Sequence, residues 1–158
     1  MSTMMPASAS ASQVQRTGSF DLDCDPETAF PLFSPEGERE WVSGWDPKPV
    51  FPDQILFCGD TVFREGIPEA IWTIVEVDRR NYRAEYVRLA PASHSAHIIV
   101  TIESTESGRS RVIVSYAVTT FGDGQACLLD SFSEDAYAAR MRDWQRRITA
   151  LLADRRSG

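Results

Sequence analysis

The chain has 158 residues, enough for one domain with a sizeable hydrophobic core. Hydrophobic residues make up 42% and charged residues 25%, which is typical of a globular protein. The formal net charge is −7 and basic residues form no long cluster, so the balance argues against nucleic acids and anionic membranes as partners.

The first residues read as a tail, followed by a strand and two short helices. Residues 1–12 repeat Ser and Ala without the basic start and apolar run of a secretory signal, so we expect a disordered tail. Alternation over residues 14–22 predicts a strand. Asp25 and Pro26 form a helix-opening pair, and Ser34-Pro35 repeats it. The second helix is expected to end near Trp41, before Gly44.

The remainder of the chain has the pattern of an antiparallel meander followed by a helix. Strands are predicted at 61–65, 70–78, 82–89, 96–103 and 111–121, joined by short turns. After Gly124, apolar residues recur at helical spacing from Leu129 to Leu152. This spacing predicts one long amphipathic helix that packs against the sheet. No run reaches the roughly 20 apolar residues of a membrane span, so a cytoplasmic protein is expected.

This order of elements resembles the helix-grip fold of the START-like (SRPBCC) superfamily, which includes Bet v 1-like proteins, polyketide cyclases and chaperone-activator relatives. The stretches PLFSPEGEREWVSGWDP (31–47) and NYRAEYVR (81–88) are similar to those of an uncharacterised bacterial branch. The resemblance implies an α+β fold in which a curved antiparallel β-sheet wraps around a long C-terminal helix, with two short helices after the first strand. It covers one domain, 13–154, and leaves 155–158 as a C-terminal tail. It also implies a largely apolar cavity between the sheet and the long helix.

Trp41 and Trp45 lie in the segment that the resemblance places beside the cavity entrance. One ring could line the cavity and the other act as a gate, because a large flat ring offers much contact area. Alternatively, both rings anchor the turn in the core. We expect an anchored rim and not a catalytic loop.

Strand parity predicts which side chains face the cavity. Arg83 and Glu85 are expected in solvent, which turns Tyr86 and Arg88 inward. Arg88 could pair with a ligand carboxylate or phenolate; the alternative is that it reaches water and that the tyrosines bond to backbone. Glu36, Glu38 and Glu40 are expected on the solvated face of the second short helix. The candidate cavity residues are Trp41, Trp45, Thr73, Tyr82, Tyr86, Arg88, His94, Ile98, Val100, Val114, Tyr116, Phe132 and Met141.

Motifs for metals, cofactors and motif-marked enzymes are missing from the sequence. Cys24, Cys58 and Cys127 are widely spaced and form no CxxC pair, so neither a disulfide framework nor a zinc site is expected. His94 and His97 are three apart on a predicted strand, point to opposite faces and cannot both bind one metal. No glycine-rich phosphate loop, GxSxG or HExxH occurs, and we expect no cofactor.

Three functions from different classes follow. The leading hypothesis is a protein, more a binder than an enzyme, that holds a small hydrophobic or aromatic molecule in the cavity. The alternatives are a polyketide cyclase/dehydratase-like enzyme that uses Tyr, His or Arg, and a protein-interaction domain related to the chaperone activators. An exposed apolar groove in place of an enclosed cavity would favour the last. The sequence does not choose between a monomer and a homodimer, and it assigns no catalytic residue.

Overall fold

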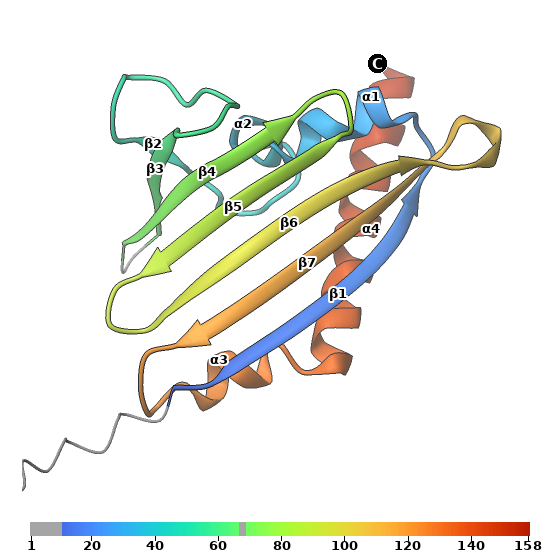
Figure 1. Ribbon diagram of the computed structural model, residues 1–158. Coiled ribbons are helices and arrows are strands. Elements are labelled where there is room, and N and C mark those ends of the chain that lie inside the picture. Colours follow the sequence, from blue (N-terminus) through green and yellow to red (C-terminus); the bar gives the residue numbers. More distant parts are fainter. Residues whose placement is uncertain (1–10, 67–68) are drawn as a thin grey trace, which may run out of the picture.

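The computed structural model describes residues 11–66 and 69–158, and the described chain folds around one seven-stranded sheet (Figure 1). The strand order is β1-β7-β6-β5-β4-β3-β2, and every neighbouring pair is antiparallel. The strands are β1 (Gln13–Leu22), β2 (Lys48–Pro49), β3 (Val62–Glu65), β4 (Ala70–Asp78), β5 (Arg83–Ala90), β6 (His94–Ser104) and β7 (Ser110–Thr120).

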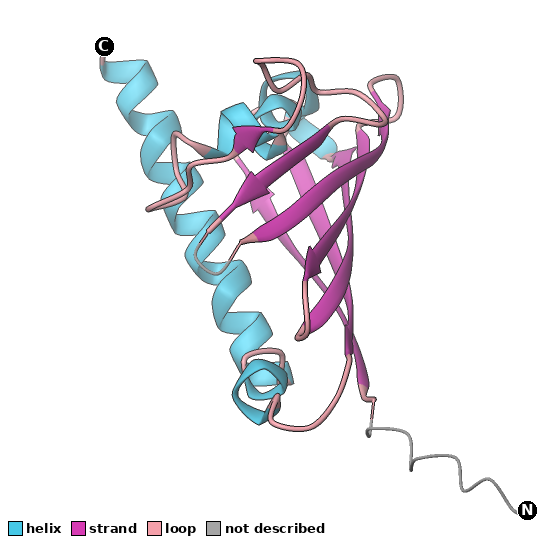
Figure 2. Cartoon of the chain, turned by 90° about the vertical axis from the view of Figure 1, so that its left-hand side faces the viewer, coloured by secondary structure: helices cyan, strands magenta, loops and turns pink. Residues whose placement is uncertain are grey.

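The helices lie on one side of this sheet, with the long one running along it (Figure 2). The short helices that follow β1 lie toward one end of the long helix, and α3 lies toward the other (Figure 1). In chain order, the helices of the described residues are α1 (Pro26–Ala29), the 3-10 helix η1 (Phe30–Phe33), α2 (Pro35–Glu38), the 3-10 helix η2 (Glu106–Gly108), α3 (Ala126–Asp130) and α4 (Glu134–Ser157). The predicted helix-grip architecture is therefore confirmed. No helix in the described part of the chain is both long and apolar enough to cross a membrane.

Both predicted helix-opening pairs cap their helices. The Thr28 amide donates to Asp25 Oδ1 at 2.8 Å, and the Gly37 amide donates to Ser34 Oγ at 3.0 Å. α2 is shorter than predicted, because it ends at Glu38 and gives way to turns before Trp41.

The predicted single C-terminal helix is two helices. Ser133 has extended backbone and accepts from the Ala136 amide at 3.2 Å, so it caps a new helix and interrupts the old one. α4 then continues to Ser157, into the segment expected to be a tail. Its last turn is held by Arg155, which pairs with Glu40, and by Arg156.

α4 packs most closely against β1, at a glycine. A Cβ atom on Gly18 would lie 2.8 Å from Met141 Cγ, so the helix can approach the strand only where a side chain is missing. The Tyr137 hydroxyl donates to the Val114 carbonyl at 2.5 Å, and Gln145 Nε2 donates to the Asp21 carbonyl at 3.0 Å. These contacts fix the long helix across the sheet.

A second glycine sets the position of α2. A Cβ atom on Gly37 would lie 2.0 Å from the Pro31 carbonyl oxygen, which belongs to backbone and cannot rotate away. We expect Gly37→Ala to lower the free energy of unfolding by about 3 kcal/mol, measured by urea denaturation. Gly44→Ala is the control, since its φ of +73° adds backbone strain of about 1 kcal/mol but its Cβ would meet open space. Equal losses in the two variants would contradict the steric explanation.

Candidate functional site

A cavity of about 160 Å³ lies between α2 with the turns after it, the inner face of the sheet and α4. All four tryptophans of the chain line it, although they come from three distant parts of the sequence. We call it the tryptophan cavity. Its lining residues are Pro35, Glu38, Trp41, Val42, Trp45, Phe63, Trp72, Tyr86, Ile98, Val100, Tyr116 and Trp144.

The aromatic walls meet at steep angles. Trp41 and Trp144 have ring centres 5.4 Å apart at 68°, and Trp45 and Trp72 have theirs 5.6 Å apart at 83°. Phe63 stacks on Trp72 at 5.7 Å and 9°, which backs that wall with a second ring. Edge-to-face pairs of this kind are favoured by the ring quadrupoles, so they stabilise the walls as well as shape them.

Trp41 and Trp45 both anchor the rim and line the cavity. Trp41 Nε1 donates to the Leu32 carbonyl at 2.8 Å, and Trp45 Nε1 donates to the Pro35 carbonyl at 2.8 Å. Each indole is thus tied to backbone by its only polar atom, while its carbon surface is left for the cavity. Each of the two rings therefore combines anchoring with lining of the cavity.

Glu38 is a lining residue that the sequence analysis placed on the solvated face. Its carboxylate has no hydrogen-bond or ion-pair partner among residues 11–66 and 69–158. Burial raises the pKa of Glu38 well above its ordinary 4.5, and the nearby Glu65 carboxylate raises it further. Glu36 and Glu40, in contrast, are exposed as predicted. The available signal was spacing, because Glu38 precedes Trp41 and Val42 by three and four residues.

The two tyrosines of the tryptophan cavity differ in how their hydroxyls are satisfied. The Tyr86 hydroxyl donates to the Phe33 carbonyl at 2.7 Å, so it serves the fold. The Tyr116 hydroxyl has no hydrogen-bond partner within the described chain, and it is not sealed from solvent. Burial raises the pKa of Tyr116 to about 12, with the Glu38 carboxylate adding to the rise. Tyr116 is therefore a neutral hydroxyl that opens on the cavity.

A second cavity of about 270 Å³ adjoins the first and shares Trp72 and Tyr116 with it. We call it the arginine cavity, because Arg88 and Arg140 are its charged lining residues. Its other lining residues are His94, Ala96, Leu128, Ser131 and Phe132. α3 and the break before α4 therefore close the end of the site opposite α2.

Arg88 is held by two partners. Its Nε lies 3.0 Å from Glu65 Oε1, and its Nη1 lies 2.9 Å from His94 Nε2. Because a guanidinium only donates, His94 Nε2 accepts, and its Nδ1–H then donates to Ser93 Oγ at 2.8 Å. Burial lowers the pKa of His94, and the charge of Arg88 lowers it further. His94 is thus neutral with its lone pair occupied, which does not suit a general base.

The structure distributes the predicted cavity residues among three places. The tryptophan cavity contains Trp41, Trp45, Tyr86, Ile98, Val100 and Tyr116. The arginine cavity adds Arg88, His94 and Phe132. Neither cavity is lined by Thr73, Tyr82, Val114 or Met141.

Each residue of the last group has a physical reason for its place. Trp72 takes the inward position on β4, so the adjacent Thr73 faces the other side of the sheet. Tyr82 lies in a turn with φ of +53°. Val114 is fully buried, and its carbonyl accepts from Tyr137. Met141 fills the space beside Gly18 in the core.

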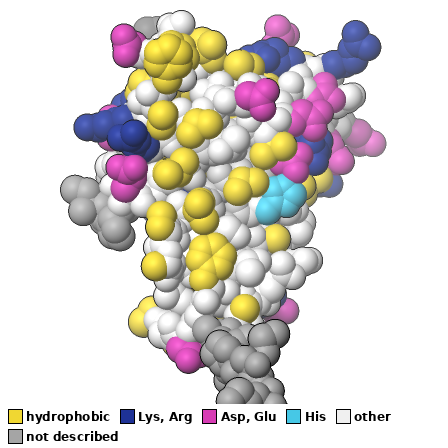
Figure 3. Space-filling model, turned by 60° about the vertical axis from the view of Figure 1, so that its left-hand side comes forward, with side chains coloured by type: hydrophobic (Ala, Val, Ile, Leu, Met, Phe, Trp, Pro, Cys, Tyr) yellow, Lys and Arg dark blue, Asp and Glu magenta, His cyan; other side chains and the backbone are white. Residues whose placement is uncertain are grey.

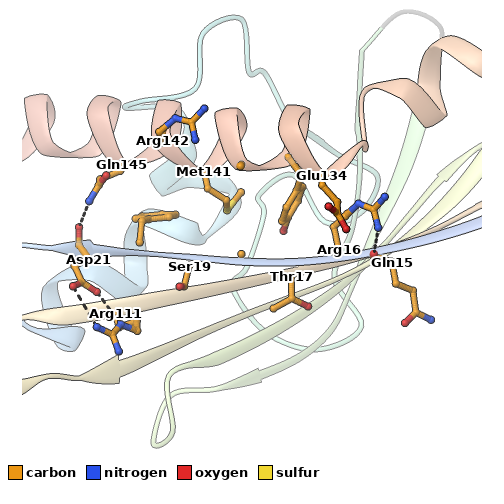
Figure 4. Close-up of a pocket in the computed structure, with 14 residues that line it drawn as sticks. Gln15, Arg16, Thr17, Ser19, Asp21, Arg111, Glu134, Met141, Arg142 and Gln145 are labelled. Carbon is orange, nitrogen blue, oxygen red and sulfur yellow. Dashed lines mark hydrogen bonds and ion pairs between the residues drawn. The ribbon is translucent and has the colours of Figure 1, made fainter.

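The largest hollow lies elsewhere, on the outer side between β1 and α4 (Figure 4). This groove of about 780 Å³ shares no lining residue with either cavity. It is lined by no tryptophan, and several of its polar groups are already paired with protein: Arg111 Nε lies 3.0 Å from Asp21 Oδ1, and Arg16 Nε donates to the Phe132 carbonyl at 2.7 Å. We therefore place the candidate site in the two inner cavities. No group of three or more His, Cys, Asp or Glu side chains that could hold a metal ion occurs in the described chain.

No family model and no curated protein matches the sequence. Solved structures match the fold. Ara h 8.0201 is 15% identical over 90% of this chain and 99% of its own, with a TM-score of 0.64. A point mutant of norcoclaurine synthase from Thalictrum flavum is 8% identical over 93% and 98%, with a TM-score of 0.65. An uncharacterised protein from Rhizobium leguminosarum is 14% identical over 92% and 97%, with a TM-score of 0.63. The chain has the Bet v 1-like helix-grip fold predicted from its sequence.

The Arg88 contacts give a stability prediction. Arg88→Met removes the cation next to Glu65, whose side chain is 19% exposed, and we expect a loss of about 2 kcal/mol in the free energy of unfolding. Arg64→Met is the control on β3, because its pair with Glu69 is half exposed at 3.5 Å and is worth under about 1 kcal/mol. Urea denaturation of both variants measures the free energy of unfolding. A larger loss for Arg64→Met than for Arg88→Met would refute the stabilising role given to the Arg88 contacts.

Glu38 gives a prediction for the dependence of stability on pH. Its folded pKa is raised, so its contribution to stability is fully present below its ordinary 4.5 and is lost as pH rises through the raised value. Glutamine cannot ionise. We therefore expect the Tm of Glu38→Gln to match that of the wild type near about pH 4 and to exceed it increasingly toward about pH 8. Glu36→Gln, at an exposed position paired with Arg39, should show no such rise. A pH-independent gap would contradict the assignment.

Proposed function

We propose that the protein binds a small hydrophobic or aromatic molecule in the tryptophan cavity, with the arginine cavity as its continuation. One observation carries this proposal: all four tryptophans line a single cavity. A mostly apolar concave site with a few convergent polar groups is the usual form of a small-molecule site. The polar groups here are the Glu38 carboxylate and the Tyr116 hydroxyl.

The anchored walls favour binding. The indoles of Trp41 and Trp45 are tied to the Leu32 and Pro35 carbonyls, so the cavity does not have to be assembled by the ligand. A site that is already ordered loses little conformational entropy on binding, and rigid rings provide contact area at low cost. The sharing of Trp72 and Tyr116 between the two cavities supports a ligand that extends from one into the other.

A solved structure of the same fold supports the proposed class of ligand. Norcoclaurine synthase from Thalictrum flavum, 8% identical over 98% of this chain and 95% of its own with a TM-score of 0.62, is known in complex with dopamine and hydroxybenzaldehyde. Those ligands belong to that enzyme. For this chain they support a small aromatic molecule as a class and no particular compound.

An enzyme remains the second candidate, and its support comes from Glu38 and Tyr116. Both have raised pKa values and both face the same cavity, which is typical of groups that move protons. His94, the histidine among the predicted cavity residues, has its lone pair occupied by Arg88. An enzymatic function would therefore depend on Glu38.

The protein-interaction function has less support. It calls for a continuous exposed apolar groove, and Figure 3 shows hydrophobic side chains in small separate groups on the face that it presents. A cytoplasmic location and a monomeric or dimeric state remain predictions from the sequence.

Neighbouring residues of β6 provide a matched pair of variants. Ile98 lines the tryptophan cavity, whereas Ile99 points to the other side of the sheet. We expect Ile98→Phe to weaken saturable binding of the neutral aromatic probe N-phenyl-1-naphthylamine by about tenfold, because the added ring fills the cavity. Ile99→Phe should change it by less than about twofold.

Circular dichroism and cooperative thermal unfolding show whether both variants are folded. Native mass spectrometry of freshly purified protein then identifies any molecule that the wild type carries. Absence of saturable probe binding to the wild type, or an equal loss in both variants, would overturn the proposed site.

A further inference from the structure

We propose that the ligand carries an organic ammonium group, which the tryptophan cavity holds between the indole rings and the Glu38 carboxylate. This inference rests on the proposed function and specifies the chemical class of the ligand. It depends on an unpaired carboxylate, on the shape of the aromatic walls and on the signs of the surrounding charges.

The first step concerns the two carboxylates near the cavity, which are treated differently. Glu65 has a cation, with Arg88 Nε at 3.0 Å, and also accepts from Trp72 Nε1 at 3.2 Å. Glu38 has neither a cation nor a donor within the described residues. Glu38 is half-buried, and a poorly solvated carboxylate without a partner favours its protonated form unless a cation binds beside it. Glu38 thus has room for a cationic partner that the described residues do not supply.

The second step is the geometry of the walls. Trp41 and Trp144 meet at 68°, and Trp45 and Trp72 meet at 83°, so the rings form corners and not a parallel slot. A slot suits a flat ring, whereas a corner surrounds a rounded group from several sides. Tryptophan faces attract cations more strongly than other aromatic rings do, and cages of such rings are the known solution for quaternary ammonium groups.

The protein already places side-chain cations against aromatic rings, and Arg88 does so at an indole. The Arg88 Cζ atom lies 5.8 Å from the centre of the Trp72 ring while the guanidinium pairs with Glu65. Arg88, Glu65 and Trp72 thus already show how a cation can be held between a carboxylate and an indole ring. Arg88 lines the arginine cavity and not the tryptophan cavity, so it leaves Glu38 and the remaining indoles without their cation.

The groups that line the tryptophan cavity with Glu38 are neutral, whereas Arg88 and Arg140 lie beyond Tyr116 in the arginine cavity. Glu65 of β3 adds negative charge, Tyr86 of β5 and Tyr116 of β7 are neutral hydroxyls, and Trp144 is the lining residue from α4. An anionic ligand would meet the Glu38 carboxylate here, because Glu65 is paired with Arg88 and does not line the tryptophan cavity. The net charge of −7 also concentrates cations near the protein.

Proton linkage adds a signature that an apolar site would not have. The pKa of Glu38 is raised in the empty cavity, and a bound ammonium would favour the ionised carboxylate. Binding must then release a proton when Glu38 is protonated beforehand. The affinity for a non-titrating cation should rise with pH until it passes the pKa of Glu38 in the free protein.

A pair of ligands with the same shape tests the inference. Benzyltrimethylammonium and neopentylbenzene differ in one atom, a positively charged nitrogen in place of a neutral carbon. We expect the wild type at about pH 8 to bind the cation about tenfold more tightly than the hydrocarbon, by titration calorimetry in two buffers of different ionisation enthalpy. Glu38→Gln should remove most of that preference, leaving only the share that the indole faces contribute, and should keep the affinity for neopentylbenzene. Glu38→Asp should retain part of the preference, and Glu36→Gln should retain all of it.

The outcomes separate this inference from the proposed function. Equal or tighter binding of neopentylbenzene by the wild type would overturn the ammonium site and leave the apolar site standing. Cation binding that Glu38→Gln does not change would overturn the role of the carboxylate. Failure of the wild type to bind either ligand would remove both proposals. Proton release that accompanies the cation, and not the hydrocarbon, would establish the linkage to Glu38.

Discussion

The close contact between α2 and the chain before it determines the rest of the site. Ser34 Oγ donates to the Pro31 carbonyl at 2.6 Å and accepts from the Gly37 amide at 3.0 Å, which closes the turn from both sides. Only glycine fits at position 37. With the turn fixed, Glu38 and Trp41 are carried to the inner side of the sheet, where the cavity forms between them and α4.

The polar groups around the two cavities are of two kinds: some are fully hydrogen-bonded within the protein, and others have no protein partner in the described chain. At one end, Glu65, Arg88, His94 and Ser93 form a continuous chain of hydrogen bonds that reaches Gln125 just before α3. Such a satisfied network rigidifies the strands that it joins. At the other end, the Glu38 carboxylate and the Tyr116 hydroxyl have no protein partner in the described chain, so the capacity for a ligand lies there.

The sequence predicts what local rules control. Strand alternation and two proline-led caps predict the elements, and the resemblance to the START-like superfamily predicts how they pack; regular β5, β6 and β7 hairpins place Tyr86, Ile98 and Tyr116 on the inner face. Three features escape those rules. A one-turn helix has no periodicity to orient Glu38. β4 is apolar on both parities, so Trp72 and Thr73 cannot be told apart. The apolar stripe of α4 serves the core as well as the cavity, and nothing in Met141 itself distinguishes these roles.

The gathering of every tryptophan around one cavity has an optical consequence. Because the ring centres of neighbouring indoles are as close as 5.4 Å, we expect excitation of one tryptophan to pass to the others before emission. A molecule that enters the cavity would alter the whole spectrum at once, not one component of it. The intrinsic tryptophan fluorescence of the protein therefore reports directly on binding in the tryptophan cavity.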